Sequence, residues 1–305
     1  MQSALNAELM MQHLSRGQVE PVADEQQYRA LFENVPIGLY ITTPDGHILD
    51  ANPTLVRMLG YPNKDSLLGT MASDLYLNPA DREQEQTLFG EADVVRNYET
   101  QLQCRNGDVI WVRDTCCAVC DENSNILFYE GSLQNITDEK RVQAELVYMA
   151  RHDPLTGLYN RHTLAEILER EISRAQRYKH PIGVLMIDVN RFKEVNDRYG
   201  HAMGDQVLQW VADVLLRSVR ESDVVVRYGG DEFLVLLIET NGETEIVRGR
   251  MIQEMEIASQ KASLLNLPIN LAIGTAHWMP ESGQSIEAVL IEADRRMYVE
   301  KARAS

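Results

Sequence analysis

The stretch 223-DVVVRYGGDEFLVLLIE-239 decides the fold of the second half of the chain. Two apolar runs, 223–228 and 233–239, flank a pair of glycines, a pattern typical of two strands joined by a tight turn. Because glycine has no side chain, such a turn can bring the backbone close to a bound substrate. The apolar run 182-IGVLMID-188 predicts a further buried strand in the same sheet.

Outward from these strands, helical and extended segments alternate. The remaining predictions are helices over about 160–178, 204–218, 243–264 and 285–303, and a last strand over 269–276. From strand 182–188 onward the order is βαββαβ, which predicts a ferredoxin-like sandwich. In that topology strand 182–188 runs antiparallel beside strand 233–239, so the end of one meets the start of the other.

Three carboxylates are expected to converge where these two strands meet. Asp188 ends the first strand, and Asp231 and Glu232 precede the second. Carboxylates so crowded repel one another unless a hard cation lies among them, and Mg²⁺ suits such an oxygen cluster. The alternative for any one of these acids is a solvated turn residue.

Residues 190–196 follow Asp188 and are expected to form a loop. Its backbone N–H groups, together with Lys193, could cradle phosphates. Taken alone, Lys193 would more often be an ordinary surface lysine.

These residues closely resemble the GGDEF family of diguanylate cyclases. The signature 229-GGDEF-233 is intact, and 153-DPLTGLYNR-161, 188-DVNRFKEVNDRYGHAMGD-205 and 293-ADRRMYVEK-301 stand at the family's spacing. The resemblance covers about residues 150–305 and implies an enzyme that condenses two GTP molecules into cyclic di-GMP and releases pyrophosphate. The alternative is a catalytically silent receptor that binds GTP or cyclic di-GMP and signals by contact with other proteins.

The resemblance also implies roles for the matching residues. Asp188, the carbonyl of Val189 and Asp231 would hold Mg²⁺ or Mn²⁺. Asp231 would help to take the proton from the attacking 3′-hydroxyl. The catalytic residues would be Asp231, Glu232 and Lys193. Among the substrate-binding residues, Asn196, His201 and Asp205 would lie near the guanine. Lys193 and Lys301 would bind the triphosphate. Independently of the family, the Asp205 carboxylate complements the N1–H and 2-amino donors of guanine and would repel N1 of adenine.

Two further expectations concern regulation and assembly. Arg220 and Asp223, in 220-RESD-223, match the RxxD site at which cyclic di-GMP inhibits its own synthesis in this family. The alternative is a helix-end arginine with a local salt bridge to Asp223. Because one domain offers one nucleotide site and the product has two equivalent linkages, the active form should be a homodimer. Where the family often has a last arginine this chain has Ser305, and Arg303 is the candidate replacement.

The first half of the chain predicts an antiparallel sheet with helices on one face. A helix near 25–33 is followed by strands 37–41 and 48–50, helical pieces to about 90, and strands 94–104, 109–120 and 126–136. The segments 34-NVPIGLYITTPDGHILDAN-52, 60-GYPNKDSLLG-69, 106-NGDVIWV-112 and 134-QNITDEK-140 resemble a PAS domain over about 25–138.

The ligand of this PAS-like segment stays unknown. Its one histidine, His47, falls in a hairpin turn, which argues against haem. Cys116, Cys117 and Cys120 read as strand cysteines rather than as metal ligands, because they do not all share one strand face.

The predicted architecture is therefore α+β with a helical linker. In the linker, Val142, Leu146 and Met149 form a short heptad seam, either between two subunits or against the chain's own domain. The predicted segments are an N-terminal extension (1–24), a PAS sensory domain (25–138), the helical linker (139–152) and a GGDEF domain (153–305).

Composition limits the function classes further. The net charge of −17 argues against a nucleic-acid partner, which would require clustered cations. The sequence contains no apolar run long enough for a membrane span, no signal peptide and no disulfide framework, so a cytoplasmic location is expected.

Overall fold

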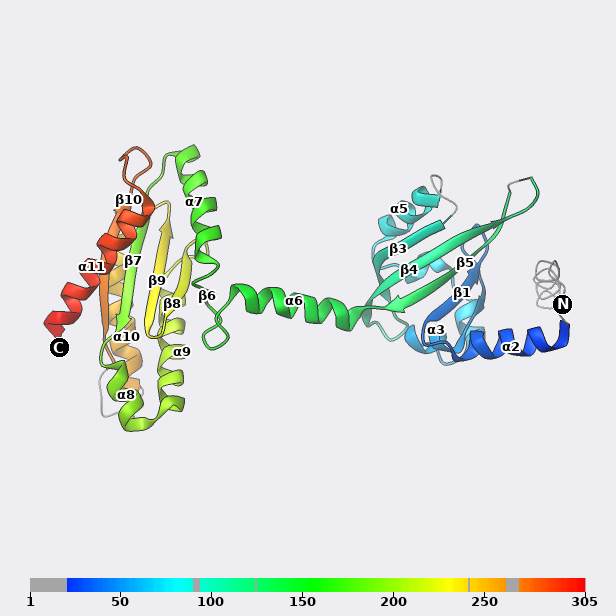
Figure 1. Cartoon of the computed structure of the whole chain (residues 1–305), viewed down its shortest axis with the longest axis horizontal. Coiled ribbons are helices and arrows are strands. Elements are labelled where there is room, and N and C mark those ends of the chain that lie inside the picture. The colour runs from blue at the N-terminus through cyan, green and yellow to red at the C-terminus, as the bar shows by residue number, and fades with distance from the viewer. Residues whose placement is uncertain (1–20, 90–93, 124, 241, 262–268, 305) are drawn as a thin grey trace. The chain divides into compact units, whose positions relative to one another are not determined.

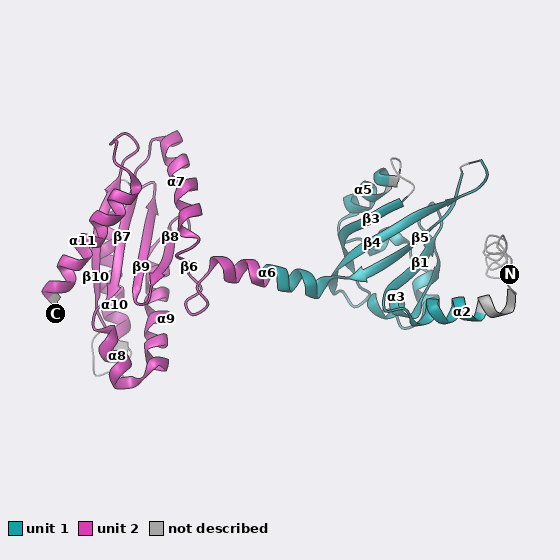
Figure 2. Cartoon of the chain, viewed as in Figure 1, with its two compact units in different colours: residues 1–144 teal, residues 145–305 magenta. Residues whose placement is uncertain are grey.

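The computed structural model describes residues 21–89, 94–123, 125–240, 242–261 and 269–304. The chain forms two compact units, residues 1–144 and 145–305, and each is built on one five-stranded sheet (Figures 1 and 2). This confirms the predicted α+β fold. Most of the predicted N-terminal extension, residues 1–20, lies outside the described residues, as do 262–264 of the predicted helix and Ser305. Within the described ranges no helix is both long and apolar enough to cross a membrane.

The first unit is an antiparallel sheet in the order β2-β1-β5-β4-β3. Its helices come before and within the run of strands, as the sequence predicted. The strands are β1 (Gly38–Thr42), β2 (Ile48–Ala51), β3 (Val94–Gln103), β4 (Val109–Cys120) and β5 (Ile126–Asn135), and the helices are α2 (Pro21–Asn34), α3 (Pro53–Met58), α4 (Lys64–Leu68), η1 (Ala72–Leu75) and α5 (Pro79–Phe89).

Asn52 fixes the start of helix α3 in this unit. Its side chain is fully buried, and its Oδ1 accepts hydrogen bonds from the N–H groups of Leu39 and Leu55. Its Nδ2 donates to the carbonyls of Phe32 and Ile37. One amide therefore caps α3 and ties it to β1 and α2 with its polar atoms satisfied.

The second unit contains the sheet β10-β7-β9-β8-β6. The predicted antiparallel pairing of the first and third strands of the βαββαβ run is confirmed, with Asp188 opposite Glu232. The elements are β6 (Tyr159–Asn160), α7 (Leu164–Tyr178), β7 (Ile182–Val189), α8 (Phe192–Tyr199), α9 (His201–Ser218), β8 (Val224–Gly229), β9 (Glu232–Ile238), α10 (Thr244–Lys261), β10 (Leu271–Trp278) and α11 (Ile286–Ala304).

Two local predictions in this unit were wrong. Residues 190–196 are not one loop, because helix α8 begins at Phe192 directly after a short turn. The helix predicted from residue 160 begins instead at Leu164, because Tyr159 and Asn160 pair with β8 as the parallel edge strand β6. The Asn160 side chain then accepts a hydrogen bond from the N–H of Thr163 at the start of the helix.

Strand β7 is buried along its whole length between two helical layers. Leu185 and Ile187 belong to a core shared with α9 and α10, whereas Val184 and Met186 belong to a core shared with α7 and α11. Successive side chains of a strand point to opposite faces, so one continuous apolar run fills both cores.

Helix α6 (Thr137–Arg151) has no buried side chain. The predicted seam residues Val142, Leu146 and Met149 are 49%, 58% and 51% exposed in the single chain. At the start of the helix, Lys140 pairs with Glu99 of β3 at 2.5 Å.

Helix α11 packs directly on strand β10 at Gly274. A methyl group at this position would lie 2.0 Å from the carbonyl oxygen of Ala293 and 2.2 Å from the backbone nitrogen of Met297. Both are backbone atoms and cannot turn aside as the tip of a side chain can. A larger residue at position 274 must therefore push α11 away from the sheet.

We expect Gly274→Ala to lower the free energy of unfolding of the second unit by about 1–3 kcal/mol through overpacking. The measurement is hydrogen exchange of β7 and β9 in the intact chain under increasing urea. The matched control is Gly249→Ala, at an exposed position of α10 where a methyl group has no neighbour within 4 Å. It should stabilise the helix by up to about 1 kcal/mol. Equal effects of the two substitutions would contradict the packing argument.

Candidate active site

The polar end of strand β7 meets the start of strand β9. Asp188 is paired in register with Glu232, and the N–H of Val189 donates to the carbonyl of Asp231 at 3.2 Å. Asp188 is only 3% exposed although it carries a carboxylate. The two strands therefore bring Asp188, Asp231 and Glu232 to one end of the sheet, as the predicted topology requires.

The two oxygens of the Asp188 carboxylate differ. Oδ2 accepts a hydrogen bond from the Lys301 ammonium at 2.5 Å, whereas Oδ1 is buried and has no hydrogen-bond partner. Burial raises the pKa of Asp188, the hydrogen bond from Lys301 opposes this rise, and the charge of Asp231 adds to it. Burial and the charges of Asp188, Asp231 and Asp294 likewise raise the pKa of Glu232. This end of the sheet thus carries more negative charge than Lys301 alone offsets.

The chemistry of these donors fits a hard divalent cation, although the side chains are not gathered around one. Among the described residues, no three acidic, histidine or cysteine side chains lie close enough together to hold a metal ion as they stand. The unpartnered Oδ1 of Asp188, the carboxylate of Asp231 and a backbone carbonyl such as that of Val189 are the oxygen donors that Mg²⁺ and Mn²⁺ prefer. A cation bound here would compete with Lys301 for Asp188.

Arg227 holds the glycine turn that leads to Asp231. Its Nε and Nη2 donate to the carbonyl of Gly230 at 3.1 and 2.8 Å, and its Nη1 donates to both carboxylate oxygens of Asp153 at 2.9 and 3.0 Å. Gly230 has a φ of +29°, a conformation that suits glycine. The arginine therefore ties the turn to a residue 74 positions earlier in the chain.

This arginine was missed in the sequence. Asp153 belongs to one of the quoted motifs, but no role was assigned to it, and Arg227 was not singled out. The available signal was a lone charged residue in the otherwise apolar strand 224–228, two residues before the glycine pair.

The residues expected to read the base lie on the helix pair α8–α9. A methyl group at Gly204 would lie 2.0 Å from the Asn196 side-chain oxygen, so the Asn196 amide rests on the first turn of α9. Asp205 is the next residue after Gly204, and both Asp205 and His201 are exposed on α9. The structure therefore places Asn196 close to the helical turn that carries Asp205.

Lys193 stands apart from the carboxylates. It is exposed in the first turn of α8, and within the described ranges no ion pair joins it to Asp188, Asp231 or Glu232. The turn before this helix is strained, because Arg191 is a non-glycine residue with a φ of +59°.

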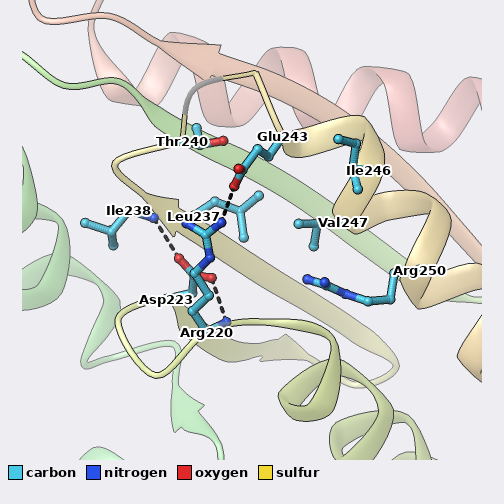
Figure 3. A pocket seen from close by; sticks show the side chains of 9 residues that line it. All are labelled: Arg220, Asp223, Leu237, Ile238, Thr240, Glu243, Ile246, Val247 and Arg250. Carbon is cyan, nitrogen blue, oxygen red and sulfur yellow. Dashed lines mark hydrogen bonds and ion pairs between the residues drawn. The ribbon is translucent and has the colours of Figure 1, made fainter.

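Arg220 and Asp223 line a separate pocket of about 130 Å³ at the other end of β9, beside Leu237 and Ile238 (Figure 3). They do not form the local salt bridge that was the alternative interpretation. The Asp223 carboxylate accepts hydrogen bonds from the N–H groups of Arg220 and Ile238 at 2.9 and 3.0 Å. The Arg220 guanidinium points across the pocket and pairs with Glu243 at 2.7 Å.

Two other residues of this pocket were also missed. Thr240 is 2% exposed, and its hydroxyl has no hydrogen-bond partner. Arg250 donates through Nε to the carbonyl of Ser218 at 2.9 Å. The sequence offers no local signal for these residues, because Thr240, Glu243 and Arg250 come from another part of the chain than Arg220.

Comparison with known proteins identifies both halves of the chain. The family model "Diguanylate cyclase, GGDEF domain" matches residues 150–305, and the model "PAS fold" matches residues 26–136.

Two curated relatives each match somewhat more than half of the chain. The diguanylate cyclase TpbB of Pseudomonas aeruginosa is 39% identical over 163 residues, which cover 53% of this chain and 37% of TpbB. The cyclic di-GMP phosphodiesterase PdeR of Escherichia coli is 34% identical over 178 residues, which cover 58% of this chain and 26% of PdeR. The chain thus spans well under half the length of either protein.

Among solved structures, the diguanylate cyclase SiaD of Pseudomonas aeruginosa, in complex with its activator SiaC, matches 54% of this chain and 64% of its own, with 30% identity and a TM-score of 0.48. Since the GGDEF family model covers half of the residues and a PAS fold precedes it, the chain belongs to the GGDEF family.

Proposed function

We propose that this protein is a diguanylate cyclase, which condenses two GTP molecules into cyclic di-GMP with release of pyrophosphate. The observation that carries the proposal is the complete set of acids at the β7–β9 end of a GGDEF domain, with one buried carboxylate oxygen of Asp188 unpartnered. The likeness to TpbB supports it.

The reaction is a phosphoryl transfer. The 3′-oxygen of one GTP attacks the α-phosphorus of the other; a P–O bond forms, the bond to pyrophosphate breaks, and the step occurs twice. Asp231 takes the proton from the 3′-hydroxyl, while Lys193 and Lys301 bind the triphosphate. A divalent cation held by Asp188, the Val189 carbonyl and Asp231 would offset phosphate charge, with Glu232 supporting that site.

The helix pair α8–α9 carries the residues that would select guanine. The Asp205 carboxylate accepts hydrogen bonds from N1–H and the 2-amino group of guanine, and the Asn196 amide and His201 lie on the same pair of helices. Adenine would present an acceptor at N1 to the same carboxylate, and the resulting repulsion disfavours it.

A silent receptor for GTP or cyclic di-GMP is the second candidate function. One observation supports it, namely that a protein named as a cyclic di-GMP phosphodiesterase, PdeR, matches over a similar length of the chain. The retained glycine pair, Asp188, Asp231 and Glu232 favour the cyclase, because a domain that only binds nucleotide does not need the complete acid set.

Asp231→Asn should abolish synthesis and leave the fold intact. A neutral amide cannot offset divalent charge or accept the 3′-hydroxyl proton, so we expect turnover to fall by about 10²-fold or more. The main-chain bond from Val189 to the Asp231 carbonyl is unaffected by the change.

The assay incubates the purified chain with Mg²⁺ and GTP and separates the products by chromatography, with thermal melting as the test of folding. Asp213→Asn, an exposed change on α9, is the matched control and should match wild type. A wild-type protein that binds GTP but makes no cyclic di-GMP would support the receptor instead.

We also propose that cyclic di-GMP inhibits the enzyme at the Arg220 pocket. Since Glu243 pairs with Arg220 there, it competes with any anionic ligand for the guanidinium. Arg220→Ala should therefore weaken inhibition by added cyclic di-GMP and leave the initial rate similar. Glu243→Gln should strengthen it.

Both effects are measured as the inhibition constant from initial rates. The matched control is Glu256→Gln, an exposed change on α10, which should behave as wild type. Identical inhibition of wild type and Arg220→Ala would remove this pocket from the feedback mechanism.

The active form is proposed to be a homodimer in which the exposed seam of α6 pairs with its copy, and PAS-dependent rotation of that seam regulates synthesis. The rotational phase of helix α6 should then affect cyclic di-GMP synthesis more than the length of the helix does. Seven residues inserted after Ala144 nearly restore the facing direction and should keep activity close to wild type, whereas four should change it strongly. Equal cyclic di-GMP synthesis by both insertion variants would mean that the linker is a passive tether.

A further inference from the structure

Two buried carboxylates face the core of the PAS unit. Asp114 of β4 is 3% exposed and Glu85 of α5 is fully buried. Asp114 Oδ2 accepts a hydrogen bond from the Tyr40 hydroxyl at 2.8 Å. Glu85 Oε2 accepts from the Tyr76 hydroxyl and from Arg82 Nη1, each at 2.6 Å. The second oxygen of each carboxylate, Asp114 Oδ1 and Glu85 Oε1, is buried and has no other partner.

These carboxylates are not balanced by positive charge. If both were ionised, the cluster would hold two negative charges and the single positive charge of Arg82. Burial raises the pKa of Asp114 well above its usual range, and the charge of the nearby Glu85 adds to this rise. The other titratable groups that face the pair are Tyr40 of β1, Tyr76 after η1, Cys116 of β4 and Tyr129 of β5.

Those four groups stay neutral. Burial raises the pKa of each of these phenols and of the Cys116 thiol, so none of them supplies a charge near neutral pH. A single proton between Asp114 and Glu85 would leave one carboxylate paired with Arg82 and no net charge in the core.

We propose that Asp114 and Glu85 form a proton-binding site in the PAS unit, in which one shared proton joins their two unpartnered oxygens and holds helix α5 on the sheet. The ligand of this unit is then the proton, and pH is an input to the protein.

Tight packing at the site favours a proton over a larger ligand. The Tyr40 ring lies across Gly131, where a methyl group would be 2.4 Å from the ring carbon Cζ and from the hydroxyl oxygen. A proton needs no cavity. A metal cation would need further ligands, and no cluster of three acidic, histidine or cysteine side chains exists within the described ranges.

Helix α5 depends on polar contacts for its position. Glu85 is its one buried residue among those whose exposure is described. Its other anchors are the Asp81 carbonyl, which accepts from the Tyr98 hydroxyl at 2.7 Å, and the Asp81 carboxylate, which accepts from Thr100 at 2.8 Å. Loss of the shared proton would leave two buried negative charges near each other with only Arg82 to offset them, and both carboxylates can reach water if α5 detaches.

The effect has a definite sign. The raised pKa of Asp114 means that the closed state binds a proton which the open state releases above the ordinary aspartate pKa of about 4. Stability of the closed state is therefore full in acid and is lost as pH rises toward the raised value. Across that window the opening equilibrium of α5 should grow by up to about tenfold per pH unit.

The experiment uses the full chain with ¹³C-labelled aspartate and glutamate. Carboxyl ¹³C shifts should show that Asp114 keeps its proton well above the ordinary aspartate pKa of about 4. Hydrogen exchange of α5, corrected for the intrinsic exchange rates, should accelerate by up to about tenfold per pH unit. Asp114→Asn, which has no proton to lose, should flatten that pH dependence, and the control Asp74→Asn should keep it.

Titration of Asp114 at the ordinary aspartate pKa of about 4 would overturn the proposal. The proposal would also fail if the hydrogen exchange of α5 kept the same pH dependence in a folded Asp114→Asn protein. It would fail as well if the protection of α5 changed with potassium or ammonium concentration at constant pH. If Asp114→Asn fails to fold, Glu85→Gln takes its place, and the ¹³C titration of wild type decides the matter without any variant.

Discussion

The candidate site depends on one strand that is buried on both faces and ends in a charge. Strand β7 is held between two helical layers, so its position is fixed along its whole length. Where the apolar run stops, Asp188 is still almost completely buried, and pairing with β9 sets Glu232 opposite it. A carboxylate in that position is not solvated by water, so the groups around it determine the chemistry of this end of the sheet.

Sequence patterns predicted the strands and their pairing well because these features are local or follow from topology. All nine predicted strands appear, with shifts of one or two residues at most ends, and the Asp188–Glu232 pairing follows from the βαββαβ order. Helix α8 was missed although Phe192, Val195 and Tyr199 pack inward at helical spacing, because eight residues show only about two turns of that pattern. Strand β6 has two residues and carries no pattern at all.

The parts of the site that the sequence did not predict are contacts between segments far apart in the chain. Arg227 reaches back 74 positions to Asp153, and Lys301 reaches back 113 positions to Asp188. The Arg220–Glu243 pair spans 23 positions and replaces the local partner that spacing suggested. Spacing along the chain identifies which residues are unusual, but partner choice depends on where the fold brings side chains together. The PAS core is a similar case, since Asp114 and Glu85 look like ordinary polar residues until the fold buries them.

The hydrogen bond between Lys301 and Asp188 would couple the two proposed ligands of this site, a divalent cation and a nucleotide. On the proposed function, a nucleotide that drew the Lys301 ammonium toward its phosphates would release the Asp188 carboxylate for a cation, and a cation on the carboxylate would release the ammonium for phosphates. Each of the two ligands would then raise the affinity for the other by the same factor, as thermodynamic linkage demands. The resting domain would hold neither strongly in the absence of the other, and an abundant divalent ion would not saturate it without nucleotide.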